Sequence, residues 1–209
     1  MRRTLLSLTT MVVALLLASG VALAVTKVGT NDPDTLRGTN KADILLGRDA
    51  NDILIALAGD DNLLGERGKD IVFGGNERRR DVGRLLGGNK NMVGGSGNDS
   101  VVGGRGSDHL LGQEGNDLLV DGPEREFAAD MVSAGEGNDV VTPVNRPAFE
   151  DIITCGGGLD RVLADRKDVL APDCEKVFVG FGSADEFTAS IPQSFFAGLH
   201  PQFEQFLRH

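Results

Sequence analysis

The chain lacks tryptophan and tyrosine, has only 7 prolines and 2 cysteines, and carries 21 basic residues against 31 acidic ones among 209 residues. Its net charge of -10 excludes the basic surface that nucleic-acid binding needs, so we expect no nucleic-acid partner. Proline is too scarce for a collagen-like triple helix. Hydrophobic residues make up 40%, which is too many for a disordered chain. A folded, acidic protein remains.

Familiar catalytic motifs are absent as well. The sequence contains no H-E-x-x-H zinc motif, no G-x-S-x-G nucleophile elbow and no G-x-x-x-x-G-K-[ST] phosphate loop. We therefore expect a protein that is not an enzyme. The alternative left open is a hydrolase that uses scattered aspartates in a cleft of the fold.

The first 24 residues have the layout of a secretory signal peptide. Arg2 and Arg3 give a positive start, an apolar run covers residues 11–18, and Ala22-Leu23-Ala24 matches the small-x-small cleavage pattern. We expect cleavage after Ala24, a secreted protein, and no membrane span in the remaining chain. A membrane anchor is the alternative, although the apolar run is short for one.

Glycine is abundant, at 29 residues, and it accompanies a regular spacing of aspartates. Steps of nine dominate the series, which consists of Asp43, Asp52, Asp61, Asp70, Asp99, Asp108, Asp117, Asp130, Asp139, Asp151 and Asp160. Two residues after each of them stands an aliphatic side chain, as Val101 does after Asp99. Glycines precede the aspartates, as in Gly94-Gly95-Ser96-Gly97-Asn98-Asp99. A period of nine residues held over so many positions indicates a repeat architecture.

At these residues the chain resembles the RTX, or haemolysin-type, calcium-binding nonapeptide repeat G-G-x-G-x-D-x-U-x, in which U is a large aliphatic residue. The resemblance covers residues 38–163, is best at 94–120 and 134–142, and weakens at 38–73, where a single glycine often replaces the pair. Residues 74–93 are expected to break the register. The resemblance implies an all-β fold, a parallel β-roll in which each nonapeptide is half a coil and eighteen residues make a full turn.

The residue types support this architecture on physical grounds. The three residues after each aspartate suit a short strand whose middle side chain points inward. The six residues before the next strand must reverse the chain, and glycine takes a positive φ at low cost. Asp99 and Asp117, eighteen residues apart, are then expected to face each other from stacked coils. Two such carboxylates repel, and a calcium ion with oxygen ligands reverses the sign of that energy.

We therefore expect several Ca²⁺ ions as the cofactor, with Asp99 and Asp117 sharing one of them. The candidate ligands are Asp99, Asp108, Asp117, Asp139, Asp61, Asp70, Asp52, Asp43 and Asp160, with the turn residues Gly95, Gly97, Gly104, Gly106, Gly115 and Gly137. Asp81, Asp130 and Asp151 lie beside insertions and are expected to be turn residues instead, which leaves Asp108 without a clean partner. The alternative is a metal-free solenoid that uses Asp and Asn only as turn formers.

The two cysteines, Cys155 and Cys174, are expected to form a disulfide in an exported chain. The bridge would staple the C-terminal end of the roll and define a cap at residues 164–180. On the chain-entropy model, closing a loop of about 20 residues stabilises the fold by roughly 3 kcal/mol. Two free thiols or a metal pair are the alternatives.

The outermost segments stand apart from the repeat. Residues 25–37 are expected to be a lead-in to the roll, and residues 181–209 a phenylalanine-rich tail. Phenylalanine is concentrated near that end, at Phe178, Phe181, Phe187, Phe195, Phe196, Phe203 and Phe206. The tail is expected to fold over the last coil as a cap. The alternative is a docking segment for a cell-surface component, which would make the protein a cell-envelope adhesion module with structural calcium.

Overall fold

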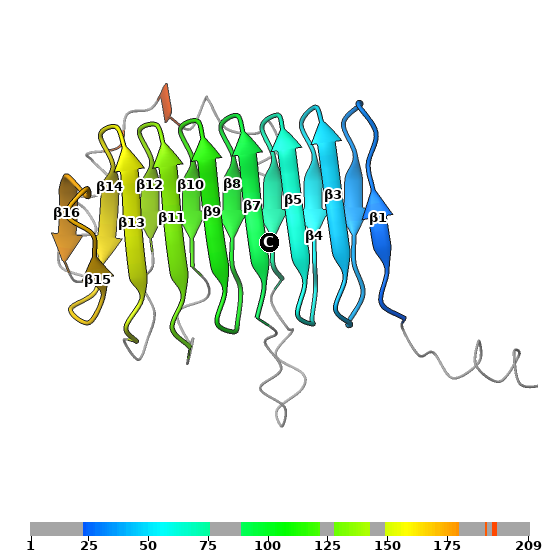
Figure 1. Ribbon diagram of the computed structural model, residues 1–209, viewed down its shortest axis with the longest axis horizontal. Helices are drawn as coiled ribbons and strands as arrows, with labels where there is room; N and C mark the ends of the chain where they lie inside the picture. The colour runs from blue at the N-terminus through cyan, green and yellow to red at the C-terminus, as the bar shows by residue number, and fades with distance from the viewer. Residues whose placement is uncertain are drawn as a thin grey trace, which may run out of the picture.

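A computed structural model describes residues 23–75, 89–121, 128–142, 149–179, 191 and 194–195. These residues form two parallel sheets of eight strands each (Figure 1). Odd-numbered strands lie in one sheet, even-numbered strands lie in the other, and the chain passes from sheet to sheet after every strand. The fold is therefore an all-β parallel solenoid, as the resemblance implied.

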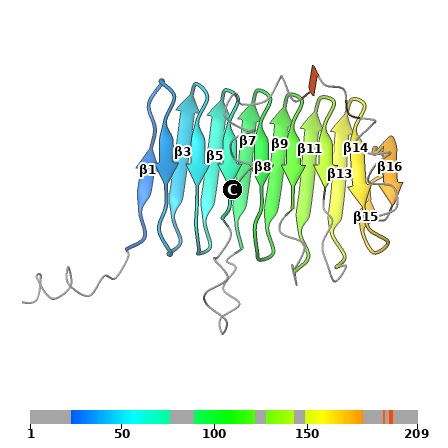
Figure 2. The ribbon, with the colours of Figure 1, turned by 180° about the vertical axis from the view of Figure 1, so that it is seen from behind.

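The sheet of odd-numbered strands, sheet A, consists of β1 (Thr26–Val28), β3 (Ile44–Asp49), β5 (Asn62–Arg67), β7 (Asn91–Ser96), β9 (His109–Glu114), β11 (Met131–Glu136), β13 (Ile152–Gly157) and β15 (Val169–Leu170). Sheet B consists of β2 (Thr35–Arg37), β4 (Ile53–Ile55), β6 (Ile71–Phe73), β8 (Ser100–Val102), β10 (Leu118–Val120), β12 (Val140–Thr142), β14 (Arg161–Ala164) and β16 (Lys176–Val179). Seen from behind, the coils again stack side by side from β1 at one end to β16 at the other (Figure 2).

The core is a row of aliphatic side chains enclosed between the two sheets. Leu45 pairs with Leu63 across neighbouring coils, and Leu63 pairs with Met92. All three are at most 2% exposed. Each of them stands two positions after the residue that ends the preceding turn, namely Asp43, Asp61 or Lys90. The sequence-based prediction of an inward middle side chain is therefore confirmed for these strands. Their burial supplies the apolar stabilisation of every coil.

Most strands of sheet A are longer than the predicted three residues. β3 has six residues because its last two also pair with β5, Arg48 opposite Glu66 and Asp49 opposite Arg67. Arg48 and Glu66 occupy the second glycine position of the repeat and still adopt positive φ values of 89° and 77°. Repeats that have lost a glycine therefore keep the same backbone path, at the cost of a strained residue.

The long spacings in the sequence do not break the register. β7 pairs with β5 in the same register that joins the regular coils, although Asn91 follows Asn62 by 29 residues. β11 likewise pairs with β9, His109 opposite Met131. The expectation that residues 74–93 break the register is therefore wrong for the strands, because β7 pairs directly with β5, although the sequence repeat itself is interrupted there. Asp81 lies outside the described residues.

The sheets extend beyond both of the expected ends of the roll. β1 pairs with β3, and β2 pairs with β4, so residues 26–37 already form a coil. β15 and β16 pair with β13 and β14 and form a further coil after residue 163. The cap region that was expected to follow the repeats thus continues the two sheets.

The outer face of sheet B is apolar. Ile53, Ile71, Leu118 and Val140 lie on the side of their strands opposite the core and are at most 9% exposed. Phe195 packs into this cluster and is 8% exposed. Phe195, a residue of the expected tail, therefore belongs to an apolar cluster that includes side chains of several coils of sheet B. Residues 180–190, 192–193 and 196–209 lie outside the described part of the chain.

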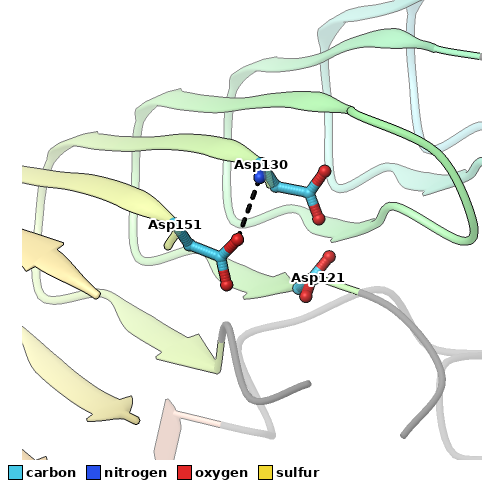
Figure 3. A group of neighbouring side chains, drawn as sticks. All are labelled: Asp121, Asp130 and Asp151. Carbon is cyan, nitrogen blue, oxygen red and sulfur yellow. Dashed lines mark hydrogen bonds between the residues drawn. The ribbon is translucent and has the colours of Figure 1, made fainter. Parts of the chain in front are cut away.

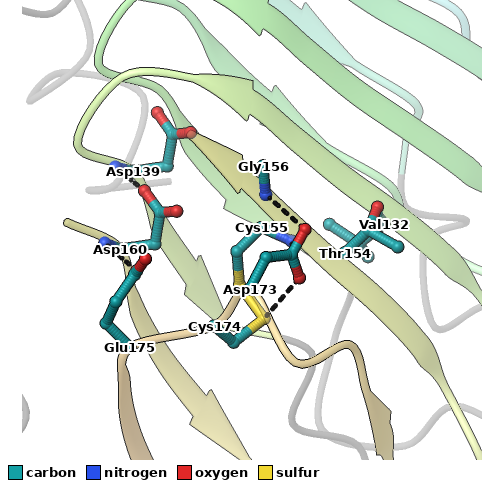
Figure 4. Close-up of a disulfide and its surroundings, with 9 residues drawn as sticks. All are labelled: Val132, Asp139, Thr154, Cys155, Gly156, Asp160, Asp173, Cys174 and Glu175. Atoms are coloured by element: carbon teal, nitrogen blue, oxygen red, sulfur yellow. Dashed lines mark hydrogen bonds between the residues drawn. A yellow bond between two sulfur atoms is a disulfide. The ribbon is translucent and has the colours of Figure 1, made fainter. Parts of the chain in front are cut away.

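Cys155 and Cys174 form the predicted disulfide, with Cα atoms 5.1 Å apart (Figure 4). Cys155 is fully buried in the core, so the bridge ties the residues after β15 to the middle of the solenoid end. The same segment carries two acidic side chains back to the preceding coil. The Gly156 N–H donates to Asp173 at 3.0 Å, and the Asp160 N–H donates to Glu175 at 3.1 Å.

Among the residues that the structure describes, no helix is long and apolar enough to span a bilayer. The expected signal peptide at residues 1–24 lies outside the described part except for its last two residues.

Candidate metal-binding edges

The turns of the solenoid fall into two rows, which we call edge A and edge B. Edge A joins each odd strand to the next even strand. We count each of its turns as the six residues before the even strand; in all but the first turn, the first three of these also form the end of the odd strand. The turns are residues 29–34, 47–52, 65–70, 94–99, 112–117, 134–139 and 155–160. Edge B joins each even strand to the next odd strand, and its turns are residues 38–43, 56–61, 74–90, 103–108, 121–130, 143–151 and 165–168. Every turn of edge A has the same length, and every long insertion lies on edge B.

A ladder of aspartates runs along edge A. Its members end the successive turns and are Asp34, Asp52, Asp70, Asp99, Asp117, Asp139 and Asp160. The N–H of each donates to the Oδ1 atom of the next, for example Asp52 to Asp70 at 2.7 Å and Asp99 to Asp117 at 2.9 Å. The expected pairing of Asp99 with Asp117 is therefore present, but it is one step of a continuous ladder. One oxygen of each carboxylate is held by the backbone of the preceding coil.

Edge B has a matching ladder with one exception. Its members are Asp43, Asp61, Lys90, Asp108, Asp130, Asp151 and Asp168. The Asp108 N–H donates to Asp130 at 2.6 Å, and the Asp130 N–H donates to Asp151 at 2.9 Å. The expectation that Asp108 lacks a clean partner is therefore wrong, and Asp130 and Asp151, which were expected to be turn residues, occupy ladder positions. These two hydrogen bonds place Asp130 at an ordinary ladder position despite the insertion that precedes it in the sequence.

In nine of the ladder aspartates the second carboxylate oxygen, Oδ2, has no hydrogen-bond partner. It is buried and unsatisfied in Asp52, Asp61, Asp70, Asp99, Asp108, Asp117, Asp130, Asp139 and Asp160. The same residues are at most 1% exposed. Buried carboxylates are costly unless they are paired, protonated or bound to a cation. A row of them in one geometry therefore points to a ligand.

Glycines leave room in front of these oxygens. A Cβ atom on Gly47 or Gly94, the first residues of two edge A turns, would lie 2.5 Å from the Oδ2 atom of Asp52 or Asp99. Positive φ values occur at the later turn positions predicted as ligands, namely Gly95, Gly97, Gly104, Gly106, Gly115 and Gly137. At Gly97 an added Cβ would also overlap the carbonyl oxygen of Gly68 on the preceding coil. The glycine pattern thus reflects close stacking of turns as well as chain reversal.

Burial dominates the electrostatics of both ladders. It raises the pKa of Asp99 to about 7, and together with the smaller effect of neighbouring carboxylates it raises that of Asp139 to about 7 and that of Asp117 to about 8. On edge B, burial raises the pKa of Asp151 to about 8. Backbone N–H donors act in the opposite direction at each of these residues but do not offset the burial. Without a cation, the ladders therefore favour bound protons.

One group on edge B brings three carboxylates together. Oxygen atoms of Asp121, Asp130 and Asp151 lie within 4.8 Å of one another, and all three residues are buried (Figure 3). Asp121 is the first residue of its turn, a position that is glycine in the turn beginning at Gly103. Burial raises the pKa of Asp130 to about 10, and the closeness of Asp121 adds to this. Asp121 was not among the residues selected from the sequence.

The donors present fit calcium. Carboxylate oxygens and turn carbonyls are hard ligands, and Ca²⁺ takes six to eight of them with flexible geometry. The unsatisfied Oδ2 atoms of successive ladder aspartates, such as Asp99 and Asp117, would hold an ion. When bound, the ion supplies positive charge that offsets the burial of both carboxylates.

A second ladder of amide side chains accompanies the aspartates on edge A. The Asn116 N–H donates to the side-chain oxygen of Asn98 at 2.9 Å, and the Asn138 N–H donates to that of Asn116 at 2.7 Å. These asparagines immediately precede the ladder aspartates, and their bonds run between the same coils. They fix the spacing of the turns without adding charge.

The sequence-based selection also omitted three ladder residues, Asp34, Lys90 and Asp168. Each ends a turn and precedes a strand, but each stands outside the clear part of the nine-residue period. A usable signal does exist for Lys90. It precedes Gly94 by four residues, the same interval that separates Asp108 from Gly112.

Comparison with known proteins agrees with this geometry. Residues 28–63, 46–78 and 87–120 match the four-copy model of the RTX calcium-binding nonapeptide repeat. No curated protein matches the chain. The matched residues contain eight complete turns of the two edges and part of the turn 74–90, and they include Asp43, Asp70 and Asp117. The coils within residues 28–78 and 87–120 are therefore RTX calcium-binding nonapeptide repeats.

Proposed function

We propose that this protein is an exported calcium-binding β-roll in which Ca²⁺ ions bridge ladder aspartates of neighbouring coils along edges A and B. The observation that carries the proposal is the row of buried Oδ2 atoms without hydrogen-bond partners, in register from coil to coil. In a solenoid that binds no cation, such a row would only destabilise the fold, because each unpaired buried carboxylate opposes folding.

The bridging residues follow from the ladders. On edge A, the pairs Asp70–Asp99, Asp99–Asp117 and Asp117–Asp139 place unsatisfied oxygens on successive coils. On edge B, the group of Asp121, Asp130 and Asp151 offers a third carboxylate. Calcium would offset the repulsion within each pair and make the folded state favourable at neutral pH.

Export is supported by two separate features. The signal-like pattern at residues 1–24 provides a route across a membrane. The Cys155–Cys174 disulfide fits an oxidising compartment. Calcium is abundant outside cells, and extracellular calcium modules commonly bind at about 10⁻⁴ to 10⁻³ M. A fold that requires calcium would then form after export.

The cell-surface alternative for residues 181–209 is less well supported. Phe195, the described phenylalanine of that segment, lies in one hydrophobic cluster with Ile71 and Leu118 of sheet B and is 8% exposed. An aromatic side chain used in this way stabilises the fold and is not offered to a partner. We therefore favour a structural role for this part of the tail.

The test is a calcium titration of the oxidised chain without residues 1–24, followed by circular dichroism and by calorimetry. We expect the β-sheet signal to rise with millimolar Ca²⁺ and to fall when a chelator is added. Mg²⁺ at the same concentration is the control, and a much smaller response is expected because Mg²⁺ demands stricter octahedral geometry. Identical spectra in calcium and in chelator would refute the proposal.

A further inference from the structure

Lys90 occupies a ladder position on edge B that elsewhere belongs to aspartate. Its N–H donates to Asp108 Oδ1 at 2.9 Å, as an aspartate N–H does in the other coils. Its carbonyl accepts from the His109 N–H at 2.7 Å, and the Asn91 N–H donates to the Asp61 carbonyl at 2.9 Å. Lys90 therefore lies between Asp61 and Asp108 with the backbone register of the ladder.

The side chain of Lys90 also takes the direction of the aspartates that it replaces. It is 2% exposed and is the largest fully buried side chain among the described residues. Its Cδ atom lies 3.0 Å from the place where a Cβ atom on Gly74, the first residue of its own turn, would be. In other turns that space faces the Oδ2 atom of the ladder residue, as Gly103 faces Asp108 at 3.2 Å. The ammonium group thus lies within the ladder and not in solvent.

A buried ammonium needs negative partners, and the ladder provides them on both sides. The positive charge of Lys90 acts on Asp61 and on Asp108, where it opposes the rise in pKa that burial causes. His109 acts on Asp108 in the same sense. Charges held this closely in a buried setting contribute to folding only when they compensate each other. One cation between two carboxylates is the arrangement that a metal ion would also produce.

We infer that the Lys90 ammonium replaces calcium on edge B, so that the two coil junctions between Asp61 and Asp108 are neutralised without a metal ion. This inference rests on the proposed bridging of aspartates by calcium. Edge B then contains two calcium-binding stretches, one before Lys90 and one from Asp108 onward, whereas edge A is continuous. The junctions beside Lys90 keep their charge balance in the absence of calcium.

The experiment compares Lys90→Asp with the wild-type chain by calorimetric titration and by native mass spectrometry in Ca²⁺. We expect Lys90→Asp to bind roughly one to two additional ions, because it restores a carboxylate between two others. Lys90→Met keeps the length of the side chain but removes its charge. We expect it to bind no additional ion and to melt at a lower temperature than wild type in chelator.

Lys41→Asp is the matched control, since Lys41 is an exposed residue of an edge B turn and the change in charge is the same. It should not change the number of bound ions. An unchanged ion count in Lys90→Asp, or a Lys90→Asp chain that stays unfolded in saturating calcium, overturns the inference. A wild-type chain that binds no calcium refutes the proposed function instead, so the two failures are distinguishable.

Discussion

The two edges of the solenoid carry the same kind of ladder but differ in the lengths of their turns. Edge A has seven turns of equal length, while edge B contains the turns 74–90, 121–130 and 143–151 that lengthen the repeat. The glycine-rich stacking seen at Gly97 and Gly115 belongs to edge A. Because every coil contributes one turn to each edge, extra residues on edge B are compatible with a regular edge A. The number of residues between successive edge A aspartates varies only because the edge B turn between them varies in length.

The largest expected effect comes from moving an insertion to the other edge. Four residues added between Glu114 and Gly115 interrupt the close stacking of edge A and displace Asp117 from its ladder. We expect this variant to lose the cooperative calcium-induced rise in β-sheet signal. The same four residues added after Glu124, in the already extended turn of edge B, should leave the transition within a few degrees of wild type.

Thermal melting in calcium, followed by circular dichroism, measures both insertion variants. If the edge B insertion is as damaging as the edge A insertion, the distinction between the edges is wrong.

The next effect is a pH dependence that both edges should share when calcium is removed. In the folded chain the pKa of Asp117 on edge A and that of Asp151 on edge B are about 8, whereas unfolded aspartates titrate near about 3.9. Between these values the folded state binds more protons, so the stability of the metal-free chain falls as pH rises from about 4 to 8. In chelator, the melting temperature should therefore increase when the pH is lowered from 8 to 5.

Calcium should reverse this trend, because protons compete with the ion for the same oxygens. Melting curves at several pH values, with calcium and with chelator, give the two slopes. Carboxyl carbon shifts in NMR spectra then show whether residues of one edge titrate apart from those of the other. A melting temperature in chelator that rises with pH would contradict the electrostatic account.

A smaller effect is expected from removing single charges within the ladders. Asp117→Asn keeps the Oδ1 atom that accepts from Asp99 but removes the carboxylate charge beside Asp139. We expect about tenfold weaker calcium binding at that step and a higher melting temperature in chelator, since one repulsive neighbour is gone. Asp43→Asn, near the N-terminal end of edge B, should change both quantities less. Calorimetric titration and melting curves decide, and equal changes in the two variants would contradict this ranking.

The sequence predicts the period, the core and the disulfide because each depends on local pattern. Leu45 and Val101 follow their aspartates by two residues, and that interval alone places them inside. The location of the insertions could not be predicted in the same way. The ladder position of Asp130 depends on a hydrogen bond from Asp108 of another coil, and no local signal in the sequence shows that the ladder continues after the insertion.

Two unusual residues of edge B were not predicted from the sequence, for a related reason. Lys90 and Asp121 do not match the residue types of the repeat, so a search by type passes over them. Their positions follow only from strand pairing, which aligns Asn91 with Asn62 and Met131 with His109. The position of Phe195 on sheet B could not be predicted either, because its hydrophobic cluster includes residues more than seventy positions away, such as Leu118.

The ladder hydrogen bonds link each coil to its immediate neighbours. Asp99 donates to Asp117 and accepts from Asp70, so ordering one junction prepares the next. Such a chain behaves as a one-dimensional lattice with nearest-neighbour coupling. If calcium bridges the ladders as proposed, edge A would be a single uninterrupted run that fills steeply as calcium rises, whereas Lys90 would be a fixed boundary on edge B. The two sides of one molecule would thus respond to the same ion with different steepness.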